Sequence, residues 1–388
     1  MKKKLKKSKG ITLVALVITI IILLILAGIS ISALTQTGIF GKAKQAEQKS
    51  KDAQEKENTT LGTYENEINE YLGENPGVEQ NKPSGETLVA NNIGKVLSTT
   101  ENIELEDINR NKIVVPAGFK IISDSTTGNA TTVDKGIVIE DATETATKGS
   151  QFVWIPVGKI TKVDGTTTTI TLGRYDFAED GKATAYSGSF VEEDTNDSST
   201  LKNIEGKSIA KNITNFKNSV AANKGYYIGR YEARTGTRRI ESGSFLTQIT
   251  EKGTDYVYNY VTQMKAASQA QGMYDSDKFT SDLMNSYAWD TATLFLQSCG
   301  TNQKYSRQSS LNIGTISLKG TTNDKQCNVY DMASNMIEWT TETSDSSGVP
   351  CVVRGGNYDG NSGYMSTRDG NFTSGSNIYI SFRPLLYL

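Results

Sequence analysis

The stretch of sequence that decides the fold is Val329-Tyr330-Asp331-Met332-Ala333-Ser334-Asn335-Met336-Ile337-Glu338-Trp339-Thr340, followed by Arg354-Gly355-Gly356-Asn357-Tyr358 and Ser381-Phe382-Arg383. Trp339, like Trp154 upstream, is expected to be a core aromatic with a hydrogen-bonded indole N–H. Gly355 and Gly356 are expected to supply backbone conformations or close approaches that a side chain would forbid. Three charged side chains are expected to form ion pairs or hydrogen bonds that organise irregular backbone: Glu338, Arg354 and Arg383.

Upstream of these motifs, short β-type runs alternate with turn residues. The runs are Ile113–Val115, Phe119–Ile122, Ile137–Ile139, Phe152–Ile155 and Thr166–Thr171, with Pro116-Ala117-Gly118 as a hairpin turn between the first two. Apolar residues at three- and four-residue steps predict a helix from Leu283 to near Gly300 and a second one over Asn212–Ala222. The acidic stretch Glu179–Asp197 is expected to be an exposed loop. Without βαβ alternation, this pattern favours an α+β fold.

The motifs resemble those of formylglycine-generating-enzyme-like (sulfatase-modifying factor) domains. The similarity begins at Gln151–Val157 and Gly225–Glu232, continues through Val329–Thr340, and ends with the Arg-Gly-Gly and Ser-Phe-Arg stretches in the same order and spacing. The resemblance implies a C-type-lectin-like fold over residues 150–388, with a small mixed core that displays long loops.

The N-terminal region carries a different signal. Met1–Lys9 is rich in lysine, and the 24 residues from Ile11 to Leu34 contain no charge. About 20 apolar residues span a bilayer core as a helix, so residues 11–34 are predicted to cross the membrane. Because the basic residues precede this helix, the globular part is expected outside the cell, at the membrane or cell surface.

Lys9-Gly10-Ile11-Thr12-Leu13-Val14 resembles the cleavage motif of type IV prepilins. The resemblance implies cleavage after Gly10, which would make Ile11 the new N-terminus. Ala15 stands where the family usually has glutamate, so both a filament subunit that contacts other pilin-like subunits and a non-assembling anchor remain open.

Changes in composition divide the chain into five segments. A polar, helix-prone stalk and linker follows the anchor and ends in Pro/Gly-rich turns near residue 85. The predicted segments are a leader (1–10), a pilin-like helix (11–34), the stalk and linker (35–84), a small β-rich segment (85–149) and the C-type-lectin-like domain (150–388).

Composition also excludes several functions. Six lysines lie in the first ten residues, so the rest of the chain has a net charge of −8 out of the total of −2, which argues against nucleic acid as a partner. The chain has no histidine, the commonest transition-metal ligand and proton-transfer group. Its cysteines, Cys299, Cys327 and Cys351, match no metal-binding spacing and allow at most one disulfide. No cofactor is predicted; structural calcium occurs in the resembling family, but no ligand spacing here supports it.

The same resemblance offers an enzymatic interpretation, which the residues disfavour. The founding family oxidises a substrate cysteine with two active-site cysteines near the chain end and copper, but Arg354–Arg383 contains no cysteine. The related iron-dependent sulfoxide synthases need histidine ligands. We therefore expect a protein that is not an enzyme, with a divergent formylglycine-generating-type enzyme and a pilus subunit as alternatives.

The fold also serves as a display scaffold in the variable proteins of diversity-generating retroelements, where the segment between the Arg-Gly-Gly and Gly-Phe-Arg motifs binds ligand. Here residues 357–379 contain no Lys, Glu, Gln or Trp, which adenine-directed mutagenesis of Asn-type codons cannot produce, and Met365 is the one residue outside that palette. Tyr, Ser, Gly and Asn are also what binding loops use. The predicted contacts with a macromolecular ligand are Asn357, Tyr358, Asp359, Asn361, Ser362, Tyr364, Ser366, Arg368, Asp369, Asn371, Phe372, Asn377 and Tyr379.

Overall fold

The computed structural model describes residues 85–122, 131–143, 147–192, 212–235, 256–257, 261–309, 323–344, 348–359, 363–376 and 378–388. By its internal contacts the chain divides into two units, Met1–Asn81 and Lys82–Leu388, and every described residue belongs to the second. The predicted leader, membrane helix and stalk (1–84), with Gly10 and Ile11, lie outside the described residues.

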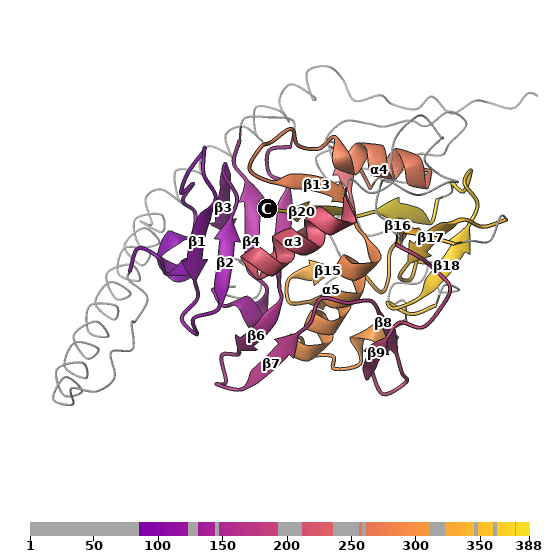
Figure 1. The fold of residues 1–388 in the computed structure, drawn as a ribbon, viewed down its shortest axis with the longest axis horizontal. Helices are drawn as coiled ribbons and strands as arrows, with labels where there is room; N and C mark the ends of the chain where they lie inside the picture. The colour runs from indigo at the N-terminus through magenta and orange to yellow at the C-terminus, as the bar shows by residue number, and fades with distance from the viewer. Residues whose placement is uncertain are drawn as a thin grey trace, which may run out of the picture. The chain divides into compact units, whose positions relative to one another are not determined.

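An antiparallel six-stranded sheet forms the centre of the described unit, in the strand order β13-β20-β10-β5-β4-β3 (Figure 1). Its strands are β3 (Phe119–Ile122), β4 (Val138–Asp141), β5 (Gln151–Pro156), β10 (Gly225–Gly229), β13 (Thr280–Leu283) and β20 (Pro384–Tyr387). The last strand of the chain therefore pairs between β13 and β10, next to the β13 edge of the sheet.

A second, four-stranded sheet has the order β18-β17-β16-β19. Its strands are β16 (Ile337–Thr343), β17 (Cys351–Arg354), β18 (Arg368–Asn371) and β19 (Ile380–Phe382). β16 pairs antiparallel with β17 and parallel with β19. Only Arg383 separates β19 from β20, so this residue joins the two sheets.

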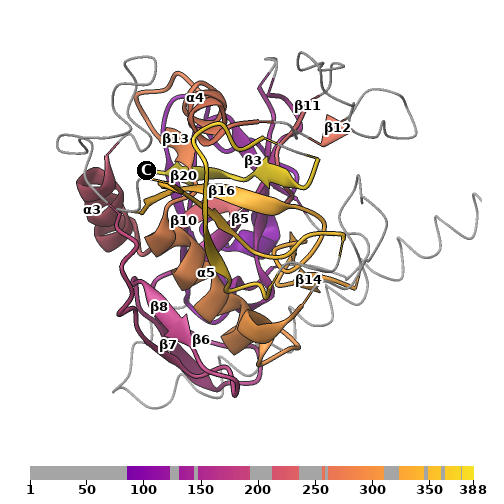
Figure 2. The same ribbon diagram turned by 90° about the vertical axis from the view of Figure 1, so that its right-hand side faces the viewer.

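Three α-helices lie in the described residues: α3 (Ile213–Asn223), α4 (Gln263–Gln271) and α5 (Ser286–Cys299). Each follows a capping side chain, Asn212, Thr262 or Asn285, that accepts a hydrogen bond from a first-turn N–H. α5 packs against β5 (Figure 2). The 3-10 helices are η1 (Val89–Asn92), η2 (Val133–Lys135) and η3 (Tyr305–Arg307).

The described residues also form five two-stranded ribbons. They are β1 (Ile103–Glu106) with β2 (Lys112–Val115), β6 (Gly158–Thr161) with β7 (Thr167–Ile170), β8 (Tyr175–Phe177) with β9 (Ala183–Ala185), β11 (Arg234–Thr235) with β12 (Tyr256–Val257), and β14 (Lys325–Gln326) with β15 (Val329–Tyr330).

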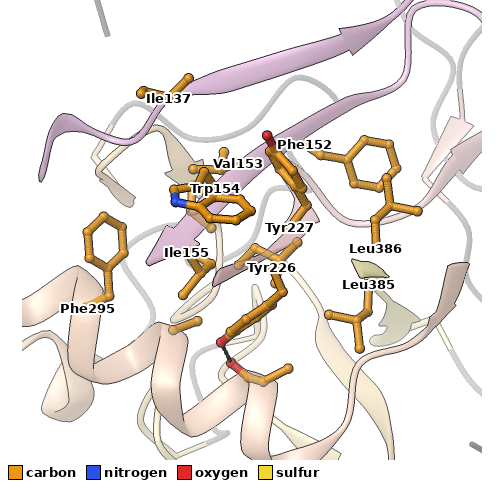
Figure 3. Close-up of a cluster of buried hydrophobic side chains, with 14 of the residues drawn as sticks. Ile137, Phe152, Val153, Trp154, Ile155, Tyr226, Tyr227, Phe295, Leu385 and Leu386 are labelled. Atoms are coloured by element: carbon orange, nitrogen blue, oxygen red, sulfur yellow. Dashed lines mark hydrogen bonds between the residues drawn. The ribbon is translucent and has the colours of Figure 1, made fainter. Parts of the chain in front are cut away.

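The main core is built around β5, β10 and α5 (Figure 3). Tyr226 and Tyr227, neighbours on β10, point to opposite sides of the strand, and their hydroxyls donate to the carbonyls of Ala288 (2.6 Å) and Val114 (2.9 Å). A smaller core joins α4 to the four-stranded sheet, and Trp339 is fully buried in it. The pairing of polar ring atoms with backbone keeps these aromatics compatible with burial.

The two tryptophans expected in the core are both fully buried. Trp339 Nε1 donates to the carbonyl of Val261 at 2.6 Å, as expected. Trp154 differs, because its Nε1 has no hydrogen-bond partner among the described residues; the ring packs against Tyr227, with 4.9 Å between centroids. The expectation of a satisfied indole is therefore wrong for Trp154.

Most predicted elements are confirmed: β2 to β5, β7, α3 and α5 all lie where the patterns place them. The turn at Pro116–Gly118 forms, with the Phe119 N–H donating to the Pro116 carbonyl at 3.1 Å, but the predicted hairpin is wrong, because β2 pairs with β1 and β3 pairs with β4. α4 was not predicted. The predicted exposed loop over Glu179–Asp197 is partly wrong in its described part, since residues 179–192 contain β9 and the half-buried Glu192; residues 193–197 lie outside the described residues.

The predicted fold class, α+β with a transmembrane helix followed by a C-type-lectin-like domain, is wrong for the described residues. Strands dominate them, and α3, α4 and α5 are their only α-helices. None of the helices in that part of the chain is long and apolar enough to cross a membrane. The physical reason is that helical periodicity with a capping residue occurs in only three described segments, whereas β-branched and aromatic residues fill the short runs between turns.

Candidate recognition surface

The segment 357–379 leaves the four-stranded sheet after β17, forms β18 and returns to β19. Two glycines in close contact with the preceding motif, Gly355 and Gly356, come directly before it. Gly355 has φ +85°, and a Cβ there would lie 2.6 Å from the Met332 oxygen; a Cβ on Gly356 would lie 2.2 Å from the Ala333 oxygen. The expected close approach is confirmed, and it fixes where the segment begins.

The other end of the segment is fixed by a buried ion pair. Arg383 Nη2 lies 2.7 Å from Glu338 Oε1, and both side chains are fully buried. Arg383 also donates to the carbonyls of Gly229 and Tyr330, each at 2.8 Å. Burial raises the pKa of Glu338, which the charge of Arg383 partly opposes. The expectation of a structural ion pair is confirmed for these two residues.

Between the two ends lies a buried ion cluster formed by Arg174, Arg354, Arg368, Asp290 and Glu342. Arg354 Nη2 lies 2.5 Å from Asp290 Oδ1, and Arg368 Nη2 lies 2.6 Å from Asp290 Oδ2. Arg368 Nε lies 2.7 Å from Glu342 Oε1, which Arg174 also contacts. Arg354 and Arg368 are register partners on β17 and β18, so the cluster attaches β18 to α5 and β16.

The charges of the cluster act on one another in the expected directions. Burial lowers the pKa of Arg354, although the carboxylate of Asp290 opposes this. For Arg368, burial acts in the same direction, but Asp290 and Glu342 together raise its pKa above the ordinary value. Breaking such a buried pair is costly because the remaining charge stays buried without its partner.

The predicted contact residues fall into three groups by exposure. Tyr364, Asp369 and Phe372 are exposed; 38% of the surface of Tyr364 and 60% of that of Phe372 is accessible. Arg368, by contrast, has only 7% of its side chain exposed and is paired inside the ion cluster. Asn357 is buried, and the half-buried members are Tyr358, Asp359, Ser366, Asn371 and Tyr379. Asn361, Ser362 and Asn377 lie outside the described residues.

The structure brings some of these residues together. The rings of Tyr358 and Tyr379 lie at 5.1 Å between centroids, so the two ends of the segment meet. Tyr364 pairs with Ser309 in an isolated β-bridge, and the guanidinium of Arg307 stacks on the Tyr364 ring at 3.9 Å. Residues 305–309 therefore adjoin the segment. No sequence signal marked Arg307, or Asp290 and Glu342 in the ion cluster, because each lies far away along the chain.

The described residues bear on two kinds of chemistry, metal binding and nucleophilic attack by a thiol. They contain no group of three or more Cys, Asp or Glu side chains that could hold a metal ion. Cys299, Cys327 and Cys351 are free, and burial raises the pKa of all three thiols, to about 12 for Cys299 and Cys351. A thiol with a raised pKa is a poor nucleophile at neutral pH.

Two solved structures are similar to this chain. Treponema denticola variable protein 1 is 14% identical over 42% of this chain and 85% of its own, with a TM-score of 0.32. The crystal structure of CarF is 20% identical over 28% of this chain and 47% of its own, with a TM-score of 0.21. No protein-family model and no curated protein matches the chain. At these scores the likenesses establish neither a fold nor a function, and the pilin and sulfatase-modifying resemblances are not established as family membership.

Proposed function

We propose that this protein binds a macromolecular ligand through the exposed part of residues 357–379. The observation that carries the proposal is the exposure of Tyr364 and Phe372, which are the only aromatic residues among the exposed large hydrophobic residues of the described chain. Aromatic side chains dominate binding energy where they become buried in an interface.

The anchoring of the segment supports this proposal. Gly355 and Gly356 fix its start, Arg383 follows its end, and Arg368 holds β18 from below. A recognition loop held on a rigid frame loses little conformational freedom on binding, so more of the contact energy appears as affinity. The Tyr, Ser, Gly and Asn content of the segment suits adaptable contacts around the two aromatic anchors.

Affinity measurements with matched variants test the binding proposal. The full chain is immobilised and exposed to a panel of purified cell-surface polysaccharides and extracellular proteins, with binding read by surface plasmon resonance. For the ligand found, the double variant Tyr364→Ala/Phe372→Ala is expected to lose at least about tenfold in affinity. The control is Ile108→Ala/Val163→Ala, which removes exposed hydrophobic side chains from turns outside the segment. Equal losses in both double variants, or no loss in the first, would overturn the proposal.

We also propose that a retroelement diversifies the segment. Met365, the one residue outside the palette, is fully buried, and its carbonyl accepts a hydrogen bond from Trp289. Sequencing the gene in several isolates is expected to show adenine-position changes at exposed codons such as 364, 369 and 372, with codon 365 unchanged. An invariant segment without a neighbouring template and reverse transcriptase would leave a binder of fixed specificity.

Display at the cell surface and the alternative of a pilus subunit depend on residues 1–84, which lie outside the described residues, and both stay predictions.

A further inference from the structure

Residues 186–192, here called the strap, follow β9. The strap contacts the ion cluster through Tyr186, whose ring stacks on Arg368 of β18. The ring of Tyr186 lies between two arginines of the cluster, 3.9 Å from the Arg368 guanidinium and 4.5 Å from that of Arg174. Tyr186 also closes the strap on itself, because its hydroxyl accepts a hydrogen bond from the N–H of Phe190 at 3.1 Å. Arg174 Nη2 donates to the Phe190 carbonyl at 2.6 Å.

The far end of the strap is attached to two other elements. Val191 and Thr343, at the end of β16, exchange two backbone hydrogen bonds of 2.8 Å each. The carboxyl group of Glu192 accepts from the N–H of Ser286, the first residue of α5, at 2.7 Å, and from the hydroxyl of Thr341. The strap therefore connects α5 and β16 to the arginine that holds β18.

We propose that the strap positions residues 357–379, here called the recognition segment, by holding Arg368, and that Glu192 is the residue through which this hold responds to pH. The inference rests on the proposed function of residues 357–379. Tyr186 makes no contact with a ligand in this scheme; it is a positioning residue that acts through Arg368.

The surroundings of Glu192 explain the direction of the pH response. Burial, and then the neighbouring carboxylate of Glu342 on β16, raise its pKa from 4.5 to about 7, against the hydrogen bonds from Thr341 and Ser286. Asp290 on α5 and the arginines on β17 and β18, with Arg174, complete the charged groups of the adjoining cluster. Because the pKa is higher in the folded chain than in the unfolded one, the protonated carboxyl stabilises the fold at low pH. That stability is lost as the pH rises through about 7.

Hydrogen exchange of the full chain, read by mass spectrometry without ligand, tests the positioning role. Tyr186→Leu keeps an apolar side chain but removes the cation–π contacts and the hydrogen bond from the Phe190 N–H, so amides of residues 363–376 are expected to exchange about tenfold faster. The matched control is Tyr175→Leu, on β8 of the ribbon that precedes the strap, where the ring packs on Phe177 at 6.2 Å and the hydroxyl donates to the Thr171 carbonyl. Its backbone N–H, which donates to Asp290, is kept in this variant, so exchange of the amides in 363–376 should be unchanged. Unchanged exchange in Tyr186→Leu, with β5 and β10 still protected, overturns the inference.

Glu192→Gln tests the pH response and also serves if Tyr186→Leu fails to fold. Between pH 6 and pH 8, after correction for intrinsic exchange rates, parent amides in 363–376 are expected to lose protection, whereas those of the variant should not. An equal pH response in both proteins overturns the role of Glu192. Because exchange is measured without ligand, it tests the positioning role of the strap independently of ligand binding. Failure of the binding proposal would appear separately, as an affinity that Tyr364→Ala/Phe372→Ala does not change.

Discussion

The recognition segment follows two glycines because backbone oxygens of the preceding motif occupy the space beside them. Around Gly356 the obstacle is the Ala333 carbonyl, which belongs to a turn where Asp331 and Asn335 have positive φ angles of 63° and 66°. Asn335 in turn accepts a hydrogen bond at its carbonyl from the N–H of Tyr358 at 2.9 Å. A turn held in this way cannot move aside as a flexible side chain could.

Replacing Gly356 by alanine is therefore expected to lower the free energy of unfolding by about 2–3 kcal/mol, because the added methyl group forces two backbone segments apart. The measurement is urea unfolding of the purified chain. Gly348→Ala is the control, since nothing lies within 4 Å of a Cβ there and its φ is not positive. A loss for Gly356→Ala no larger than that of the control would contradict the role assigned to this contact.

At the scale of elements, the side chains of β18 alternate between a face held by the ion cluster and an exposed face that is available for binding. Arg368 points into the ion cluster, whereas the next residue, Asp369, is exposed. Phe372 lies beyond the end of the strand, so its 60% exposure does not depend on this alternation. Successive residues of a strand face opposite sides, so a strand fixed by one face is free to present the other. The same short element can therefore be both held and variable.

Arg368→Met is expected to lower the free energy of unfolding by about 3–5 kcal/mol, because Asp290 and Glu342 lose one of the charges that compensate them in a buried site. Phe372→Ser, four residues along and exposed, should change it by less than about 0.5 kcal/mol. Urea unfolding of both variants measures the two free energies of unfolding. Similar small values for the two would show that the buried pairs contribute nothing measurable.

At the scale of the whole molecule, the fold is held without a covalent cross-link among its cysteines. Cys299, Cys327 and Cys351 are all free. Their raised pKa values, about 12 for Cys299 and Cys351, follow chiefly from burial. Stability thus comes from the two cores and from the buried charges that connect the sheets.

The thermal transition is expected to be the same with and without a reducing agent. At pH 8 the folded chain should react with Ellman's reagent far more slowly than the chain in concentrated urea, because thiolates are scarce at that pH when the pKa is near 12. The unreduced, unfolded chain should titrate three thiols. Recovery of only one thiol would reveal a disulfide and contradict this account.

The sequence by itself determined the elements whose signals are local. β-type runs predicted β2 to β5, and a capped, periodic stretch predicted α5. The paired glycines predicted the close backbone approach at Gly355 and Gly356. These succeeded because side-chain periodicity and backbone freedom are properties of neighbouring residues. α4 was missed because its sequence Gln263–Gln271 is polar, and the burial of its apolar residues depends on packing against β13 and the four-stranded sheet.

Only the tertiary structure decided which members of the recognition segment face outward. Arg368 looks like a contact residue in the sequence, but its carboxylate partners lie 78 and 26 residues away, at Asp290 and Glu342. Tyr186 stacks on the same guanidinium from a stretch expected to be an exposed loop. Pairing between distant segments depends on the packing of the whole chain, which no local pattern encodes, and that packing separates the buried Arg368 from the exposed Tyr364 and Phe372.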